Sequence, residues 1–540
     1  MDHNINIVKS KKCCNRKKLI VFIFFPLGIV LLFFGMFCQS LFNAILKDKL
    51  VLKKGGQTFK TWQMPPIPVY VKFHIYNYTN VQDIITKRAK PHVQEVGPFT
   101  YQEIRYNQIL DYNEDNITYI QNYTYQFVPS MSCATCNDNT TVWVPNISFL
   151  SVLRDIHDKV KNPNWFTSMS IQAFLGGLKG TTLFHKIAVK KLIWGYEDDI
   201  LSVMSNLQGL LSTFGVKLPS SSMIQLQRNG TAYANDLGNL TVLTGKQNVN
   251  DVQRVVAWRG RPTAPYWNTP WANMINGSEG AQAPPFVSRS DRLYAFAPQL
   301  CRSFYFKYDK DVTFHGIPMF RFRPGTAKNK DNVTVSPNSP EFCNDTEVCL
   351  DGILPVGPCQ FGNPPIFMSS PHFYLADPKL QGRILGLNPD PVKHSSFIDV
   401  EPTIGVTMRG YKRMQVNIMA RKSFVKISQV FEHDVNFLPL CYVEQIGEID
   451  EPTGSMFRNM VLMPKDIMKY GGITFIVVGA ALILLTSYIL VTGYYGKRKL
   501  KNGDKCCEKS VDNDNEPLKK DLMAGADIPD ATEMSKLRRD

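Results

Sequence analysis

Two stretches of the chain carry no charged side chain, and they lie near its two ends. Residues 19–46 and 470–496 contain no Asp, Glu, Lys or Arg and are mostly apolar. A helix of about 20 residues crosses the roughly 30 Å hydrocarbon core of a bilayer, and both stretches reach that length. The pattern predicts two membrane-spanning helices that flank a loop of residues 47–469, with tails 1–18 and 497–540 beyond them.

The first apolar stretch follows a run of basic residues, as the core of a cleaved secretory signal also does. Its apolar run, LIVFIFFPLGIVLLFFGMFC, is longer than the roughly 7 to 15 residues of a signal core, and no clear small-x-small cleavage pattern follows it. We therefore expect an uncleaved anchor. Basic residues flank both stretches on their tail sides, which predicts two cytosolic tails. Lys47 and Lys49 oppose this orientation, but long loops cross membranes largely regardless of charge.

Glycosylation sequons give an independent indication of topology. Ten N-x-[ST] patterns occur in the chain, and all of them lie between the two apolar stretches. They begin at Asn77, Asn116, Asn122, Asn139, Asn146, Asn229, Asn239, Asn276, Asn332 and Asn344. Such patterns are acceptors for N-linked sugar in secreted segments. We expect the loop to be lumenal or extracellular and to be glycosylated at these asparagines.

The loop itself shows the periodicity of strands over much of its length. Runs rich in β-branched and aromatic residues alternate with Pro, Gly and Asn, as in VYVKFHIYNYTN from Val69. This pattern predicts an antiparallel sheet or barrel. Helical spacing is found chiefly in 147–215, where apolar residues recur at three- and four-residue steps. Those residues are Phe149, Leu153, Ile156 and Val160, followed by Ile200, Met204, Leu207 and Leu211.

Seven of the twelve cysteines lie in the loop, where an oxidising compartment favours disulfides. The pair in FCNDTEVC, Cys343 and Cys349, is open to three interpretations: a metal clip, a redox pair or a structural bridge. The nearest histidine is His372, and no second histidine lies beside it, so a zinc site is the weaker interpretation. For Cys133 and Cys136 we favour a local structural bridge over a redox pair, because no thioredoxin-like strand and helix surround them.

Four further cysteines adjoin the apolar stretches on their tail sides. Juxtamembrane cysteines among basic residues are candidates for palmitoylation, with unmodified thiols as the alternative. They are Cys13, Cys14, Cys506 and Cys507. The formal net charge of the chain is +15, which favours anionic ligands or surfaces. Nothing in the sequence indicates a nucleic-acid partner.

A series of motifs in the loop resembles the class B scavenger receptors, a family that includes fatty-acid translocase and the lysosomal integral membrane proteins. Together the motifs span about residues 55–420. In chain order they are PPIPVYVKFHIYNYTN, VQEVGPFTYQE, LIWGYEDDIL, NMINGSEG, LCRSFYF, GIPMFRF, SPHFYLADP, GLNPD, VEPTIGVTM and KRMQVN. The resemblance implies a β-barrel ectodomain capped by a helical bundle from 147–215, with a hydrophobic tunnel that leads lipid to the membrane.

The resemblance also implies how the cysteines pair. It joins Cys301 to Cys359 and Cys343 to Cys349, so that FCNDTEVC is interpreted as a structural bridge. A third bridge found in some members is missing, because Ala272 occupies one of its positions and the position just ahead of Cys343 is not a cysteine either. This two-bridge set is more like the lysosomal integral membrane type than the fatty-acid translocase type. Cys441 has no assigned partner, and we expect a buried free thiol.

A basic surface on the cap is the expected ligand site. The resemblance places it within LKGTTLFHKIAVKKLIWGY, where the candidate residues are Lys179, His185, Lys186, Lys190 and Lys191. A solvated helix face is the competing interpretation. Family members usually have an acidic residue ahead of the L-[LI]-W-G-Y pattern, so the two lysines found there make this cap more basic. We expect Trp194 and Tyr196 to belong to the core.

The sequence therefore predicts a two-pass receptor that binds lipids, fatty acids or sterols, and lipoproteins or other anionic particles. We expect residence in the plasma membrane. A lysosomal or endosomal receptor that carries a lumenal protein or exports lipid is the alternative. The tail lacks an acidic dileucine or a tyrosine-based sorting motif. We expect no cofactor, no metal and no catalytic site, since the chain has no HExxH, GxSxG, Walker or GxGxxG motif.

A two-pass ligand-gated channel is the remaining alternative, because it shares the two spans and the bridged, glycosylated outer loop. A pore requires polar or charged lining, whereas the second span offers only small residues and a few hydroxyls. Gly471, Gly472 and Gly479 are better explained as helix-packing positions, with a contact between two copies of the chain as one option.

Overall fold

The computed structural model describes residues 2–137, 139–177, 182–198, 200, 223–224, 226–227, 237–325, 327–328, 334–335, 342–343, 348–360 and 362–503. They belong to two compact units, a helical unit within 1–37 and 471–540, and an ectodomain, Cys38–Tyr470. The long helices α1 (Asp2–Leu50) and α13 (Met463–Gly503) begin and end the described chain. By length and apolar composition, Leu19–Leu50 and Glu451–Tyr495 are candidate membrane spans, which fits a two-pass protein.

The helical unit is held together by close contact between the backbones of α1 and α13. A Cβ atom added to Gly28 would lie 3.0 Å from the carbonyl oxygen of Gly479, and one added to Gly35 would lie 2.6 Å from that of Gly472. Small residues at such positions allow membrane helices to approach closely. Gly472 and Gly479 are therefore packing positions within one chain. A Cβ added to Gly471 would meet no atom within 4 Å, so its role as a packing position stays a prediction.

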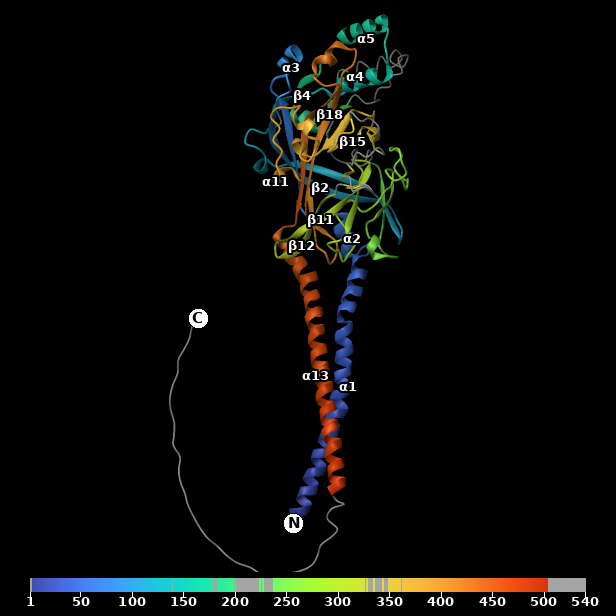
Figure 1. The fold of residues 1–540 in the computed structure, drawn as a ribbon, viewed down its shortest axis with the longest axis vertical. Helices are drawn as coiled ribbons and strands as arrows, with labels where there is room; N and C mark the ends of the chain where they lie inside the picture. Colours follow the sequence, from blue (N-terminus) through green and yellow to red (C-terminus); the bar gives the residue numbers. More distant parts are fainter. Residues whose placement is uncertain are drawn as a thin grey trace, which may run out of the picture. The chain divides into compact units, whose positions relative to one another are not determined.

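The ectodomain is built on one antiparallel sheet of 13 strands (Figure 1). Its strand order is β10-β11-β12-β17-β18-β19-β1-β2-β3-β8-β9, with β15 and β16 attached to β18. The strands are β1 (Val69–Tyr78), β2 (Val93–Tyr112), β3 (Asn116–Phe127), β8 (Leu240–Leu243), β9 (Val255–Trp258), β10 (Arg292–Ala297), β11 (Arg302–Phe314), β12 (Ile317–Pro324), β15 (Ile353–Pro355), β16 (Ile366–Ser369), β17 (Phe397–Val400), β18 (Thr407–Arg421) and β19 (Val435–Glu448).

A short segment bridges the two edge strands and nearly closes the sheet. Val255 of β9 donates its N–H to the carbonyl of Gly277 at 2.9 Å, and Phe296 of β10 donates to the carbonyl of Ser278 at 2.8 Å. Gly277 has φ of 84°, and a Cβ there would lie 2.0 Å from the carbonyl oxygen of Tyr294. Only glycine fits that conformation and approach. The NMINGSEG motif is thus the closure of the sheet, and the predicted fold class is confirmed.

The cap contains three described helices, α4 (Ile147–Lys159), α5 (Trp165–Gly177) and α6 (Val189–Trp194). Figure 1 places α4 and α5 at the end of the ectodomain opposite α2 (Gln57–Gln63) and β12. Phe149, Leu153 and Ile156 are buried, as their helical spacing predicts. The pair β4 (Thr141–Pro145) and β5 (Phe184–Ala188) lies beside these helices in sequence. Of the second predicted helical series only Ile200 is described; Met204, Leu207 and Leu211 lie outside the described residues.

The cap also affects one of the glycosylation candidates. Asn146 is only 2% exposed, and its side chain caps α4 by accepting a hydrogen bond from the N–H of Phe149 at 3.1 Å. This placement argues against a glycan on Asn146. Asn77, Asn116, Asn122, Asn139, Asn239 and Asn276 are at least partly exposed, while Asn229, Asn332 and Asn344 lie outside the described residues.

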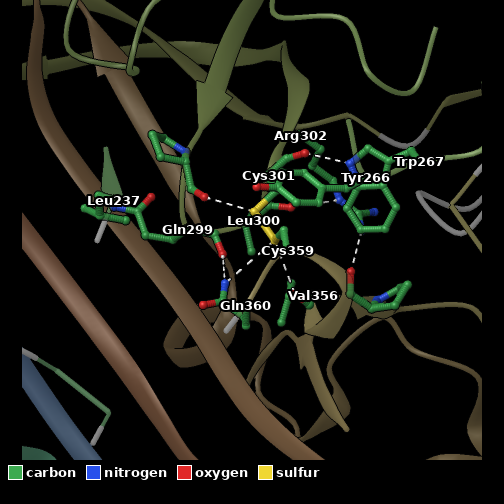
Figure 2. Close-up of a disulfide and its surroundings, with 12 residues drawn as sticks. Leu237, Tyr266, Trp267, Gln299, Leu300, Cys301, Arg302, Val356, Cys359 and Gln360 are labelled. Atoms are coloured by element: carbon green, nitrogen blue, oxygen red, sulfur yellow. Dashed lines mark hydrogen bonds between the residues drawn. A yellow bond between two sulfur atoms is a disulfide. The ribbon is translucent and has the colours of Figure 1, made fainter. Parts of the chain in front are cut away.

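Three disulfides join Cys133 to Cys136, Cys301 to Cys359, and Cys343 to Cys349. Figure 2 shows the bond between Cys301 and Cys359, which is buried beside Trp267. The Trp267 indole donates to the carbonyl of Cys301 at 2.6 Å. Cys441 is a free, fully buried thiol, and burial raises its pKa to about 12.

The guanidinium of Arg302, next to this bridge, explains the C-R-S motif. It is 3% exposed and lies over two rings, 4.5 Å from the centroid of Trp267 and 4.2 Å from that of Phe342. It also donates to the carbonyl of Pro355 at 2.6 Å. Burial lowers the pKa of Arg302 to about 9, so the side chain remains charged near neutral pH. Cation–π contact and hydrogen bonds to backbone carbonyls stabilise this buried charge.

A histidine network lies on the outer face of the sheet. Glu95 accepts hydrogen bonds from His74 at 2.6 Å, from His372 at 3.1 Å and from Tyr442 at 2.9 Å. His394 stacks on His372 with ring centroids 4.4 Å apart and accepts from the N–H of Asp390. Burial, aided by the neighbouring His372, lowers the pKa of His394 from 6.5 to about 4.

The buried bridge between Cys301 and Cys359 is expected to stabilise the ectodomain by restricting the unfolded chain. Replacing both cysteines by alanine should lower the free energy of unfolding by about 2 to 4 kcal/mol, since the bridge closes a loop with a sequence separation of 58. Thermal unfolding of the purified protein measures the change. A variant as stable as the wild type would contradict this account.

The histidine network should make the fold sensitive to acid. Between about pH 6.5 and pH 4 the unfolded chain binds a proton at His394 and the folded chain does not, so the free energy of unfolding falls as the pH falls. His394→Asn retains an acceptor for the Asp390 N–H and removes the titrating group. Its melting temperature should fall less than that of the wild type across this range. If the melting temperatures of the variant and the wild type fall equally between these pH values, His394 is not the group responsible.

Candidate functional site

The ectodomain encloses a cavity of about 2390 Å³. Ligand pockets in proteins usually measure roughly 300 to 1,000 Å³, so this space is unusually large. A barrel of about eight strands is just filled by its own side chains, and a wall with more strands leaves unfilled space. The size of the cavity therefore follows from the 13-stranded sheet.

The cavity reaches from the cap to the opposite end of the ectodomain. At the cap end its wall includes Ile147, Ser148 and Ser151 of α4. At the other end it includes the segment 64–68, which follows α2 and leads into β1. Figure 1 shows α4 and α2 at opposite ends of the ectodomain. Residues at these two ends of the ectodomain thus line one continuous space.

Much of the wall is apolar because alternate residues of each strand face inward. β18 contributes Met414 and Val416, and β19 contributes Val443, which pairs with Met414 across the two strands. Phe304 of β11 and Met368 of β16 continue this surface. Such a wall suits an aliphatic chain, which is excluded from water at about 25 cal/mol per Å² of apolar surface.

Charged side chains interrupt the apolar wall, and four of them interact with one another as a cluster, namely Glu103, Arg105, Glu279 and Lys412. Glu103 and Arg105 share one face of β2 because they are two residues apart. Lys412 of β18 pairs with Gln445 of β19, and that glutamine donates to both carboxylate oxygens of Glu103 at 3.0 Å. Glu279 belongs to the NMINGSEG segment that closes the sheet. The fold thus brings into one interior space residues that are far apart in sequence.

Burial and the neighbouring charges shift the pKa values of this cluster. Burial raises the pKa of Glu279, against the effect of Arg105 and of the hydrogen bond from Tyr119. Burial lowers the pKa of Lys412, against the attraction of Glu103. For Arg105 burial opposes the charge, but Tyr123, Glu103 and Glu279 outweigh it and raise the pKa. Arg105 keeps 26% of its side-chain surface accessible because the side chain lines the cavity.

The structure distributes the predicted cap residues over two neighbouring elements. Lys186 lies on β5, and Lys190 and Lys191 lie on α6; all three side chains are exposed. His185 instead lies partly buried, with its ring 5.6 Å from that of Tyr196, and burial lowers its pKa. Its ring packs against Tyr196, and contact of His185 with a ligand stays a prediction. Lys179 lies outside the described residues.

Trp194 and Tyr196 belong to the packed part of the cap, as expected. The Trp194 indole donates to the Tyr101 hydroxyl at 3.3 Å, and its ring meets that of Tyr125 at 5.3 Å. Sequence analysis missed a separate feature at the start of α5. Trp165 is 75% exposed, Phe166 71% and Met169 51%. Exposed apolar groups gathered in this way mark contact surfaces. The sequence did contain an indication of this surface. Two adjacent aromatic residues begin α5, and the helix has no clear hydrophobic stripe that would bury them.

The interior charges were also missed, although their motifs were noticed. Lys412 lies in KRMQVN and Glu279 in NMINGSEG, but neither motif shows that its charged residue faces a cavity. The period-two spacing of Glu103 and Arg105 was the one available signal. Among the residues that the structure describes, no group of three or more His, Cys, Asp or Glu could hold a metal ion.

Comparison with known proteins agrees with the motifs and the fold. The sequence profile of the CD36 family matches residues 19–490. Lysosome membrane protein 2 of Rattus norvegicus is 32% identical over 433 residues, which cover 78% of this chain and 84% of that protein. Scavenger receptor class B member 1 of Cricetulus griseus is 30% identical over 463 residues, 85% of this chain and 86% of that protein. The Bos taurus receptor of the same name is 30% identical over 485 residues, 89% and 90% of the two chains. The chain therefore belongs to the CD36 family.

Proposed function

We propose that this protein is a scavenger-type membrane receptor that passes lipid through the interior of its ectodomain. The observation that carries the proposal is the single cavity of about 2390 Å³ that extends from α4 to the segment 64–68. An acyl chain or sterol in water exposes apolar surface at about 25 cal/mol per Å². An apolar interior whose wall extends to both ends of the ectodomain would remove most of that cost during transfer.

The cap is the proposed receiving surface. Lys186, Lys190 and Lys191 supply positive charge there, and Trp165 with Phe166 supplies exposed apolar surface on α5. A mixed surface of this kind suits a lipoprotein or another anionic particle, whose surface carries both charged headgroups and apolar chains. Charge brings the particle to the cap, and apolar contact holds it there.

In the proposed arrangement residues 47–469 lie outside the cytosol, and the tails 1–18 and 497–540 lie within it. The sequons and the basic flanks of the two candidate spans support this topology. Palmitoylation of Cys13, Cys14, Cys506 and Cys507 would attach both tails to the inner leaflet. The side chains of all four lie outside the described part of the chain.

A lysosomal role is the second candidate. The similarity to lysosome membrane protein 2 and the presence of only two bridges in the 301–359 region favour it. There the same cavity would export lipid from the lumen, or the cap would carry a lumenal protein. Imaging of the tagged full-length protein against plasma-membrane and lysosomal markers separates the two settings.

Narrowing the cavity should block lipid transfer without removing the receptor. Met414→Trp adds bulk to the inward face of β18, opposite Val443, and should lower transfer of a fluorescent fatty acid from particle to cell by about 5-fold or more. The matched control is Val392→Trp on α11 (Pro391–His394), a position 79% exposed on the surface. Equal transfer by both variants at equal surface expression would contradict the passage.

Removing charge from the cap should weaken capture of anionic particles. The triple variant Lys186→Gln, Lys190→Gln and Lys191→Gln is expected to lower binding of phosphatidylserine vesicles by about 10-fold or more. Binding of vesicles made of phosphatidylcholine alone should change little. A control with the same loss of charge at Lys54, Lys60 and Lys310 should bind as the wild type does. Unchanged vesicle binding by the cap variant would show that these lysines form a solvated surface with no role in ligand binding.

A further inference from the structure

In the interior charge cluster, the two carboxylates accept several hydrogen bonds, whereas the two basic side chains donate few. Glu103 accepts from the Tyr125 hydroxyl at 3.0 Å, from Gln445 and from Arg105 at 3.2 Å. Glu279 accepts from the Tyr119 hydroxyl and from Gln121 at 3.0 Å. Both carboxylates therefore accept hydrogen bonds from neutral donors of β3 or β19, and Glu103 also accepts one from Arg105 of β2.

The two cations retain unused donors. The guanidinium of Arg105 donates to Glu103 and lies over the Tyr123 ring at 5.4 Å, which leaves most of its five N–H groups without a partner in the described structure. The ammonium of Lys412 donates to none of the residues that the structure describes. Its side chain is accessible, and the surface that it exposes belongs to the cavity.

A buried ammonium whose N–H groups make no hydrogen bond costs folding free energy, even where carboxylates nearby attract its charge. The inward face of β18 also accepts an apolar residue, because Met414, two positions further along the strand, lines the same space. A methionine at 412 would serve the fold as well. Arg105 and Lys412 have N–H groups to spare, whereas the neighbouring carboxylates of Glu103 and Glu279 already accept hydrogen bonds. This imbalance indicates that a ligand from outside the chain accepts hydrogen bonds from the two cations.

We infer that Lys412 and Arg105 form an oxyanion site inside the cavity that holds the headgroup of a transported amphiphile. The ligand class is a single-chain or double-chain lipid with a carboxylate or phosphate group. Its aliphatic part would lie along Met414, Val443 and Phe304, and its oxyanion would receive the free N–H groups. The inference rests on the proposed lipid passage and adds a binding site within it that is selective for anionic lipids. Neutral lipids would not bind at this site.

The test uses the full-length protein in nanodiscs and calorimetric titration with palmitate, 1-hexadecanol and palmitoyl lysophosphatidate. Palmitate and 1-hexadecanol have the same chain and differ in charge. The wild type should bind palmitate about 10-fold more tightly than 1-hexadecanol. Lys412→Met should abolish this preference and leave the binding of 1-hexadecanol unchanged. Lys412→Arg should restore the preference, since it returns a cation to the same place.

Lys72→Met is the matched control, because Lys72 lies on the outer face of β1 near Glu444, with its Nζ 3.7 Å from a carboxylate oxygen. It should keep the wild-type preference. Lys412→Met should also melt no lower than the wild type, since it removes an ammonium that makes no hydrogen bond to the described residues. Lysophosphatidate binding that depends on Lys412 would identify phosphate headgroups as ligands, and dependence for palmitate alone would identify carboxylates.

Several results would overturn the inference. Equal binding of palmitate and 1-hexadecanol by the wild type would show that the cluster does not discriminate between a charged and a neutral headgroup. Equal weakening of both ligands in Lys412→Met, or a large fall in its melting temperature, would show that Lys412 serves packing. Failure of the wild type to bind any of the three lipids would refute the proposed passage itself. A wild type that binds 1-hexadecanol but not palmitate would refute only the oxyanion site.

Discussion

Closure of one long antiparallel sheet is the constraint on which the ectodomain depends. An open sheet would leave two rows of unpaired N–H and C=O groups at β9 and β10. The backbone of Gly277 and Ser278 pairs with both edges, and a side chain at Gly277 would collide with the carbonyl of Tyr294. Once the sheet is closed it has an inside, and alternation along each strand assigns every second residue to it. The cavity is a consequence of this closure and of the number of strands.

Stability and passage make opposite demands on that interior. A filled core would bury more apolar surface, whereas a passage requires space along its whole length. The protein meets both demands by concentrating its packing elsewhere. One dense cluster joins the cap to β1, β2, β18 and β19 through Phe149, Leu153 and Phe184, and a second surrounds Trp258 and Trp267 near the long disulfide. The strands between these clusters are free to carry polar groups on their inner face.

The motifs that carry the family resemblance have different physical roles. LCRSFYF places Cys301 in a disulfide and Arg302 over two neighbouring aromatic rings. In the same cluster Ala272 and Phe342 are both buried, at or beside the positions where some members have a third bridge. Apolar packing takes the place of a covalent link there. KRMQVN, in contrast, presents Arg413 to Glu444 at 2.6 Å on one face of β18 and Lys412 to the cavity on the other.

The sequence by itself determined the features that depend on local composition. Two uncharged stretches of sufficient length predicted the spans, and the spacing of Phe149, Leu153 and Ile156 predicted the buried face of α4. The fold class came from motifs spread along the chain, because each fixes a turn, a bridge or a close approach. His185 and Asn146 were assigned to a ligand surface and a glycan on pattern alone, but the structure places His185 partly buried and Asn146 buried.

Only the tertiary structure decided which polar residues meet. Lys412 and Arg413 are adjacent, so they must face opposite sides of a strand, but the sequence does not say which side is inside. The register of β18 against β19, and the closure of the sheet by the segment that contains Glu279, settle that choice. Residues separated by hundreds of positions then share one interior space. Pairing between distant strands is a property of the whole sheet, and no local pattern encodes it.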